Sequence, residues 1–381
     1  MPRLWQDVLT MKRYLIASMT LYLACQADSD IYFDQVPEPQ SISELTVAEH
    51  NEQLTLENGK VQWEFQIPAQ TQSFTLYVDG LDGAEYLITE LESPDGVLVR
   101  SEATSQEAAS GLGLAAAPFF SANRSVGDHG GTSILVPNDP RIKVTQGNWR
   151  ATLQSTQSSQ HSVRVKRLEQ QATGRPKSIR IPLNIYLSGA GGINEDNCAD
   201  HPRMQRALTE LTSIFSRVSI DIIPVQFFQI SDEFQIIEDF TLHNDQGLSL
   251  LRSAQDQEGI NLFIIERFES DEAVLGTVGG VSAAIPGDPH AGGRFSGVVV
   301  ATSFSEDEPQ TDLLGLTIAH EIGHFLGLFH TEEAAGFEDN IEDTNTESPN
   351  NLMHHLSQLG FDQLTAQQGM VLRSHPAGQL P

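Results

Sequence analysis

The sequence predicts two domains of different class, an antiparallel β-sandwich followed by an α/β domain with a mostly parallel sheet. In residues 44–169 apolar side chains recur at every second position, the period of a strand with one buried face. In residues 177–378 short apolar runs alternate with segments of helical spacing, as in a sheet covered by helices. The polar segment 170–177 separates the two patterns and is the predicted domain boundary.

The first domain consists of short alternating runs separated by turn signals. The runs lie at 61–67, 74–78, 142–144 and 149–153. Turn residues such as Ser93-Pro94-Asp95-Gly96 stand between them, and helical spacing is almost absent. This pattern favours a β-sandwich or jelly roll and resembles the small sandwich domains that accompany secreted bacterial peptidases. Residues 101–120, rich in Ala, Ser and Gly, predict a long loop.

The second domain alternates strands with helices. Strands are predicted at 181–187, 220–230, 261–268, 280–285 and 297–301. Helical spacing of apolar residues predicts a helix from Met204 to Val218 and a shorter one at 248–256.

A third predicted helix begins near Thr311 or Asp312, either of which can cap it. Its core-facing stripe is formed by Leu314, Ile318, Ile322 and Phe325, which recur at four, four and three residues. The helix is predicted to end near Gly327, because glycine readily adopts the left-handed conformation that terminates helices.

Histidines on another face of this helix predict a metal site. His320 and His324 stand one turn apart, so two imidazoles can reach one ion. The turn at Gly327 lets His330 approach from a new direction, and three nitrogen ligands leave one position open, as in a catalytic zinc site. Glu321 lies beside the metal, where its carboxylate can act as the catalytic base. The alternative is that the histidines only decorate a helix.

The motif His320-Glu321-x-x-His324-x-x-Gly327-x-x-His330 resembles that of the metzincin zinc peptidases. The resemblance implies one catalytic Zn²⁺, peptide-bond hydrolysis, and a twisted sheet whose strand at 280–285 is an antiparallel edge. Asn350-Asn351-Leu352-Met353 matches the Met-turn of the family, which implies that Met353 forms an apolar floor beneath the zinc. A generic core methionine is the alternative.

Within that family the sequence looks closest to the pappalysin-like group. The segments HEIGHFLGLFHT, EDNIEDT, NNLM and LTAQQGMVLR follow its order, and the last predicts a helix with a capping box from Thr365 to Gln368. Two features depart from the group. The chain lacks the cysteines for disulfides around the zinc, and His355 stands where a tyrosine is usual. His355 could donate a hydrogen bond in the transition state, ligate zinc weakly, or lie on the surface.

The N-terminus predicts export. Lys12 and Arg13 precede an apolar stretch, 14–24, that is too short to span a bilayer, and Cys25 follows it. Residues 1–25 therefore resemble a lipoprotein signal with Cys25 as the lipidated residue, which would attach the protein to a membrane. Residues 26–43 are polar and predict a tether. The outer surface or full secretion is the expected location.

The formal net charge of −29 argues against nucleic-acid binding, because the chain has no basic surface to displace counterions from phosphates. Related enzymes can bind Ca²⁺ just after the third histidine, where this chain has Asp339, Glu342 and Asp343, although a solvated acidic loop is the plainer reading. With only two cysteines, Cys25 and Cys198, a disulfide framework is excluded, and Cys198 is expected to be an inert thiol.

The sequence therefore predicts a monomeric zinc endopeptidase that acts on proteins or peptides. The rival from another class is an adhesion or binding protein whose metzincin-like domain has lost activity. A third hypothesis for the same site is the hydrolysis of a non-peptide amide.

Overall fold

The computed structural model describes residue 39 and residues 41–101, 125–238, 242, 244–255, 257–269, 278–290, 292–305, 307–332, 339–344 and 350–381. The signal segment, Cys25, most of the predicted tether and nearly all of the predicted loop at 101–120 lie outside the described residues. Among the described residues, no helix is long and apolar enough to span a membrane.

The first half of the chain is an antiparallel sheet of nine strands in the order β1-β9-β3-β7-β6-β4-β8-β2, with β5 paired to β4. The strands are β1 (Leu45–Leu56), β2 (Lys60–Ile67), β3 (Thr71–Asp79), β4 (Glu85–Glu92), β5 (Leu98–Ser101), β6 (Ser125–His129), β7 (Gly131–Val136), β8 (Gly147–Ser155) and β9 (His161–Ala172). The alternating residues 142–144 are an exception to the prediction, since they form no strand.

The two halves of this sheet pack face to face around an aromatic core. Phe74 on β3 contacts Phe65 on β2 with ring centroids 5.8 Å apart, and Trp149 on β8 with centroids 5.1 Å apart. Strand β3 pairs with neither β2 nor β8, so these contacts cross from one layer to the other. The first half is therefore an antiparallel β-sandwich, as the alternation predicts.

The second half is built on a sheet in the order β11-β10-β13-β16-β15. Its strands are β10 (Ile179–Leu187), β11 (Ile220–Gln229), β13 (Ile260–Ile265), β15 (Gly280–Ser282) and β16 (Val298–Ala301). Pairing is parallel throughout except for β15, which runs antiparallel to β16 at the edge. The predicted strand at 261–268 is broken, because residues Arg267–Phe268 leave the main sheet as β14 and pair with β12 (Ile236–Ile237).

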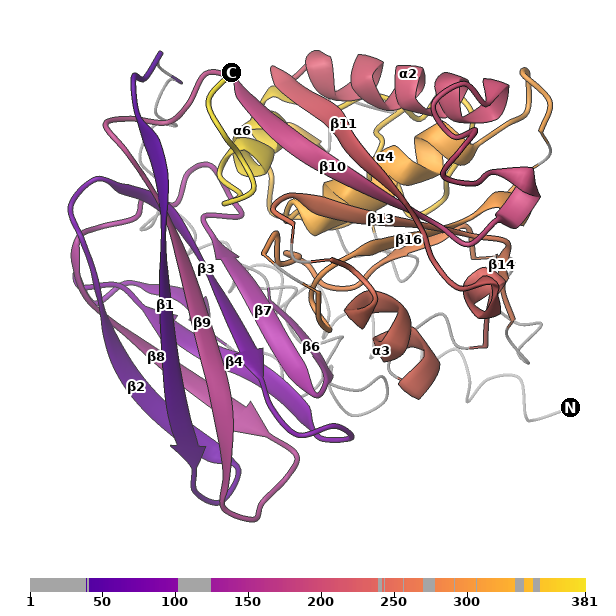
Figure 1. Ribbon diagram of the computed structural model, residues 1–381. Helices are drawn as coiled ribbons and strands as arrows, with labels where there is room; N and C mark the ends of the chain where they lie inside the picture. The colour runs from indigo at the N-terminus through magenta and orange to yellow at the C-terminus, as the bar shows by residue number, and fades with distance from the viewer. Residues whose placement is uncertain are drawn as a thin grey trace, which may run out of the picture. The chain divides into compact units, whose positions relative to one another are not determined.

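Helices cover both faces of this sheet (Figure 1). Helices α2 (Pro202–Ser216) and α4 (Leu314–Phe325) pack on one face against alternate strand residues such as Leu262 and Ile264. Helix α3 (Asp245–Arg252) packs on the other face against Phe263 and Ile265. It starts three residues before its predicted position, because Asn244 caps it by accepting a hydrogen bond from Gly247 N–H. Helix α6 (Ala366–Arg373) has the predicted capping box of Thr365 and Gln368.

The sandwich and the α/β half belong to one compact unit, Pro37–Pro381. Strand β9 ends at Ala172 and β10 begins at Ile179. Between the halves, buried side chains of the sandwich bond to carbonyl groups of the α/β half. Tyr77 Oη donates to Gly287 O at 2.5 Å, and Gln170 Nε2 donates to the carbonyls of Arg373 and His375 at 3.2 and 3.1 Å. Buried carbonyls and hydroxyls satisfy each other across this contact, as buried polar groups require.

His375 is fully buried where the sandwich contacts the α/β half, and its hydrogen bonds are those of a neutral imidazole. Its Nδ1 accepts a hydrogen bond from Ala377 N–H at 3.1 Å, while its Nε2 donates to Gly287 O at 2.9 Å. A proton added to Nδ1 would meet the N–H of Ala377 instead of an acceptor. Burial, which is complete, lowers the pKa of His375 from its usual 6.5 to about 3.

This environment predicts a pH-dependent contribution to stability. Because the pKa is lower in the folded state, the unfolded chain takes up the proton first as the pH falls. His375 should therefore reduce the free energy of unfolding below about pH 6.5, by up to about 1.4 kcal/mol per pH unit. His375→Gln can still donate to Gly287 O but cannot titrate, so its stability should fall less steeply between about pH 6.5 and 5. Urea unfolding of both proteins at several pH values measures this, and parallel curves would contradict it.

Candidate metal centre

Helix α4 carries the site, and all twelve of its residues are buried. Its N-terminus is tied to α2 through Asp312, which accepts hydrogen bonds from Arg203 and Arg206 and from Leu314 N–H. Burial alone would raise the pKa of Asp312, but the hydrogen bonds from Arg203 and Leu314 outweigh it and lower the pKa. Leu313, not Thr311 or Asp312, occupies the N-cap position, although the Asp312 carboxylate does bond the first turn, close to the predicted cap.

The structure brings the three predicted histidine ligands together. His330 Nε2 lies 3.3 Å from His320 Nε2 and 3.1 Å from His324 Nε2. The three side chains offer ligand atoms that all lie within 4.8 Å of one another. A tetrahedral zinc ion with bonds of about 2.0–2.1 Å requires nitrogen atoms about 3.3–3.4 Å apart. The donor set and its spacing therefore fit a metal ion of this kind.

Hydrogen bonds to backbone carbonyls set the tautomers of the two helix histidines. His320 Nδ1 lies 2.7 Å from Leu352 O, and His324 Nδ1 lies 2.8 Å from Leu328 O. A carbonyl can only accept, so each Nδ1 carries the hydrogen and each Nε2 presents its lone pair to the centre. Burial, followed by the neighbouring His330 and His320, lowers the pKa of His324 well below its ordinary value. The imidazole is thus kept in its neutral, ligating form.

The third histidine reaches the centre because the helix ends in a sharp turn. Gly327 has φ +104°, in the left-handed region predicted for it. Its N–H bonds to His324 O at 2.9 Å, and Leu328 N–H bonds back to Gly323 O at 3.0 Å. After this turn, Thr331 N–H donates to Met353 O at 2.9 Å, which holds the residue next to His330 against the turn containing Met353.

Met353 lies directly against α4 and is fully buried. A Cβ atom on Gly323 would lie only 2.5 Å from the Met353 sulfur, so glycine is needed for the helix to approach it. Met353 therefore packs against the helix that carries His320 and His324, and its role as an apolar floor beneath a zinc ion stays a prediction.

Two polar residues that the sequence did not single out for the site hold this turn in place. Asn351 Oδ1 accepts from Met353 N–H at 2.8 Å, and Asn351 and Gln368 exchange side-chain hydrogen bonds of 2.9 and 3.1 Å. The pair positions Leu352, whose carbonyl bonds to His320. The capping box predicts that Gln368 lies in a helix. Its hydrogen bond to Asn351, seventeen residues earlier, could not be predicted from the neighbouring sequence.

Glu321 is buried beside the histidines but is not part of the ligand cluster. Burial raises its pKa to about 8, and a hydrogen bond from the backbone of Ser282 opposes that rise. Strand β15 passes so close that a Cβ on Gly280 would lie 2.6 Å from Glu321 Cγ. The Glu321 side chain thus lies between the three histidines and the edge strand.

His355 is half-buried and lies on the same cavity as the three histidines and Glu321. Its Nδ1 lies 2.9 Å from Glu332 O, and its ring centroid lies 6.5 Å from that of His330. His355 is therefore outside the ligand cluster. Its role as a transition-state group or weak ligand stays a prediction.

The acidic segment after His330 makes structural contacts. Asp343 accepts from Thr365 Oγ1 at 2.6 Å and from Gln367 N–H at 3.1 Å, at the start of α6. Asp339 accepts from Thr344 Oγ1 at 2.6 Å, and Glu342 lies 4.0 Å from Arg141. Calcium binding here stays a prediction. Cys198 is fully buried, and burial raises the pKa of its thiol to about 11, as expected of an inert thiol.

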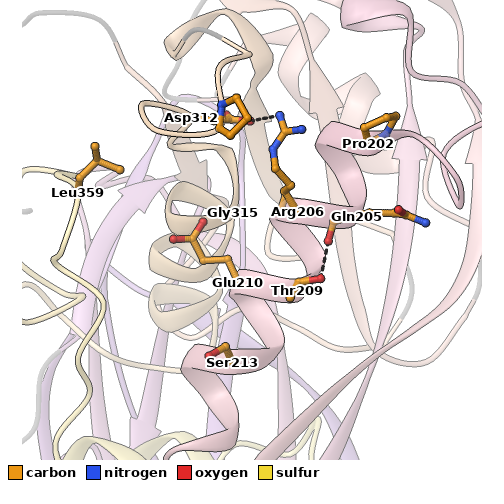
Figure 2. Close-up of a pocket in the computed structure, with 11 residues that line it drawn as sticks. Pro202, Gln205, Arg206, Thr209, Glu210, Ser213, Asp312, Gly315 and Leu359 are labelled. Atoms are coloured by element: carbon orange, nitrogen blue, oxygen red, sulfur yellow. Dashed lines mark hydrogen bonds and ion pairs between the residues drawn. The ribbon is translucent and has the colours of Figure 1, made fainter.

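The cavity over the metal centre has a volume of about 640 Å³. It is lined by the three histidines, Glu321, residues of β15, the apolar side chains Val278, Ile285 and Phe304, and residues 355–358. A second hollow lies between α2 and the start of α4, where Arg206 bonds to Asp312 and Glu210 lies beside Gly315 (Figure 2). None of the metal-centre histidines lines that hollow, and we assign it no function.

No model of a known protein family matches the sequence. No curated protein matches it either. Solved structures that match include a metalloproteinase-II from Bacteroides fragilis, 14% identical with a TM-score of 0.34, over 54% of this chain and 55% of that one. A Bacillus licheniformis lipase in its propeptide form matches at 11% identity and a TM-score of 0.18, over 36% of this chain and 24% of the lipase. The chain thus spans about half of the metalloproteinase. Similarity at this level shows neither a family nor an activity for the chain.

The contact between Gly323 and Met353 predicts the sign of a substitution. Alanine normally stabilises a helix interior by about 0.5–1 kcal/mol over glycine. Gly323→Ala should instead destabilise the protein by about 1–3 kcal/mol, because the new methyl group displaces Met353. Urea unfolding of Gly323→Ala in the wild-type and Met353→Ala backgrounds measures this, since the second background leaves room for the methyl. An equal loss in both backgrounds would refute the role of Met353.

Proposed function

We propose that the protein is a zinc-dependent endopeptidase. The observation that carries the proposal is the convergence of three imidazole nitrogens, at the spacing of a tetrahedral metal, beside a buried carboxylate that is not a ligand. A site with only three protein nitrogens keeps one position for a reactant, which is the arrangement of catalytic rather than structural zinc. Pappalysin-like membership and the choice of zinc over other metals are part of this proposal.

A zinc ion held by His320, His324 and His330 would supply a Lewis acid that polarises a carbonyl and acidifies water. Glu321 would take the proton from that water and deliver it to the leaving amine. Glu321 lines the same cavity as the three histidines, so one carboxyl group is placed to take part in both steps. A backbone hydrogen bond from Ser282 ties the Glu321 carboxylate to β15, and both residues line the cavity.

The shape of the site favours a polypeptide substrate. Strand β15 ends the sheet and pairs only with β16 among the described strands, so its outer edge can bind an extended chain by strand addition. That edge borders the cavity beside Glu321, and several apolar side chains line the same space. An extended peptide on this edge would pass over the metal centre.

The alternative, an inactive binding protein, is less well supported by the site. A structural metal site needs ligands but no base. Among the described residues Glu321 has no partner of opposite charge, so its burial opposes folding. A carboxylate in that position is explained by the proton transfer that peptide hydrolysis needs. Hydrolysis of a non-peptide amide uses the same groups, and a substrate panel separates it from peptide hydrolysis.

Glu321→Gln separates the two functions. Zinc content should stay near one ion per chain, because all three imidazoles remain. Hydrolysis of casein or of a peptide library should fall by about 10²–10⁴-fold, the usual contribution of general acid–base catalysis. His324→Ala is the matched control, since it should lose most of the zinc as well as the activity. Equal rates for Glu321→Gln and wild type would rule out Glu321 as the base, and an inactive zinc-loaded wild type would favour the binding protein.

We also propose that the protein is exported and attached to a membrane through Cys25, as a monomer. The support is the sequence of residues 1–25, with its basic start and short apolar stretch before the cysteine. A single acyl chain binds membranes only marginally, so attachment of this kind requires more than one chain.

Mass spectrometry of the mature protein from its native host tests this attachment. The N-terminal peptide should begin at Cys25 and carry the mass of its acyl chains. Cys25→Ser should appear unprocessed or in the medium. A mature wild-type N-terminus at another residue would contradict lipidation.

A further inference from the structure

Strands β3 and β7 and the second half of β9, which are adjacent in the sandwich, are buried on both faces. Side chains alternate between the faces of a strand, so one set, including Phe74 and Ile134, faces the sandwich core. The other set contacts the α/β half. On β7 this set is Gly131, Ser133 and Leu135. A Cβ on Gly131 would lie 2.5 Å from the Phe295 ring, and Ser133 Oγ donates to Pro286 O at 3.0 Å.

Leu135, the third residue of this set, contacts the turn that ends the metal-binding helix. It is 1% exposed and belongs to the same apolar cluster as Leu326 and Leu328. A Cβ on Gly327 would lie 2.6 Å from Leu135 Cδ2. The side chain of Leu135 therefore closes over Gly327 from the sandwich side.

A second line of contacts reaches the same helix end. Tyr77 and Ser133 bond to the carbonyls of Gly287 and Pro286, and Gly287 N–H in turn donates to Phe325 O at 2.8 Å. Phe325 is the last residue of α4. Sandwich residues therefore contact the end of helix α4 in two ways, through Leu135 and through the hydrogen bonds of Tyr77 and Ser133.

The turn beneath Leu135 controls two of the three ligands. Leu328 O accepts the hydrogen bond from His324 Nδ1, which sets the tautomer of that ligand. Two residues later the same turn delivers His330 to the centre. A shift of this turn would therefore misplace one imidazole and release the orientation of another.

Resting on the proposed zinc site, we infer that the β-sandwich is a permanent part of the metal centre's support and that Leu135 is a positioning residue for His324 and His330. The sandwich is then not a segment to be removed for activity. No described sandwich residue lines the cavity over the metal centre, so the described sandwich does not obstruct a substrate there. Its removal would leave the carbonyls of residues 286, 287, 373 and 375 without their sandwich donors.

The test compares two leucines of the sandwich that are equally buried. Leu135→Ala removes the contact with Gly327, whereas Leu153→Ala on β8 makes the same truncation within the sandwich, where Leu153 is 0% exposed. Zinc affinity is measured by competition with a chromophoric chelator on the full chain, and unfolding of the zinc-free proteins is measured in urea. Leu135→Ala should bind zinc about 10–100-fold more weakly, as for other groups that orient metal ligands. Leu153→Ala should lose stability but keep the wild-type zinc affinity.

Leu135→Met, which conserves the volume, should restore the affinity to near that of wild type. If Leu135→Ala does not fold, Leu135→Val makes a smaller truncation for the same measurement. Wild-type affinity in the truncated Leu135 variant, or an equal loss in Leu153→Ala, would overturn the inference while leaving the zinc site intact. A wild-type chain that binds no zinc would instead overturn the proposed function.

Discussion

The candidate metal site depends on one requirement, that its helix histidines present unprotonated Nε2 atoms to a single point. Two backbone carbonyls meet it by accepting the Nδ1 hydrogens of His320 and His324. Those carbonyls belong to Leu352 and Leu328, so the turn containing Met353 and the turn after α4 must both be rigid. The Asn351–Gln368 pair fixes the first, and Gly327 with its sandwich contact fixes the second. Much of the surrounding fold can be understood as support for these two turns.

Close backbone approach is the second constraint on the site. Gly280, Gly323 and Gly327 each stand where a methyl group would meet Glu321, Met353 or Leu135. Strand β15, Met353 and the sandwich can therefore all pack closely against helix α4 and the turn that ends it. This crowding explains why α4 is buried on every side, although its sequence suggested a single apolar stripe.

Local relations in the sequence predicted most of what lies within one element. The spacing of His320 and His324, the left-handed Gly327 and the capping box at Thr365 are relations over four residues or fewer, and each is present in the structure. Relations between distant segments were not predictable. Leu352 lies 32 residues from His320, and every residue type has a backbone carbonyl, so the sequence does not indicate which one accepts the hydrogen bond. Ser73 is a polar residue next to the alternating run 74–78, and Gln170 lies in the polar segment predicted as the domain boundary. Both are nevertheless fully buried against the α/β half.

The contact between the halves also constrains how the chain can be assembled. Ser73 bonds to Ser374, 301 positions later, and Gln170 bonds to carbonyls 203 and 205 positions later. Contacts of such long range form late, because the intervening chain must first be ordered. During synthesis the outer face of β9, β3 and β7 therefore cannot be fully covered until residue 375 has emerged. Chains with a net charge of −29 repel one another electrostatically. This repulsion limits aggregation through the uncovered outer face of β9, β3 and β7.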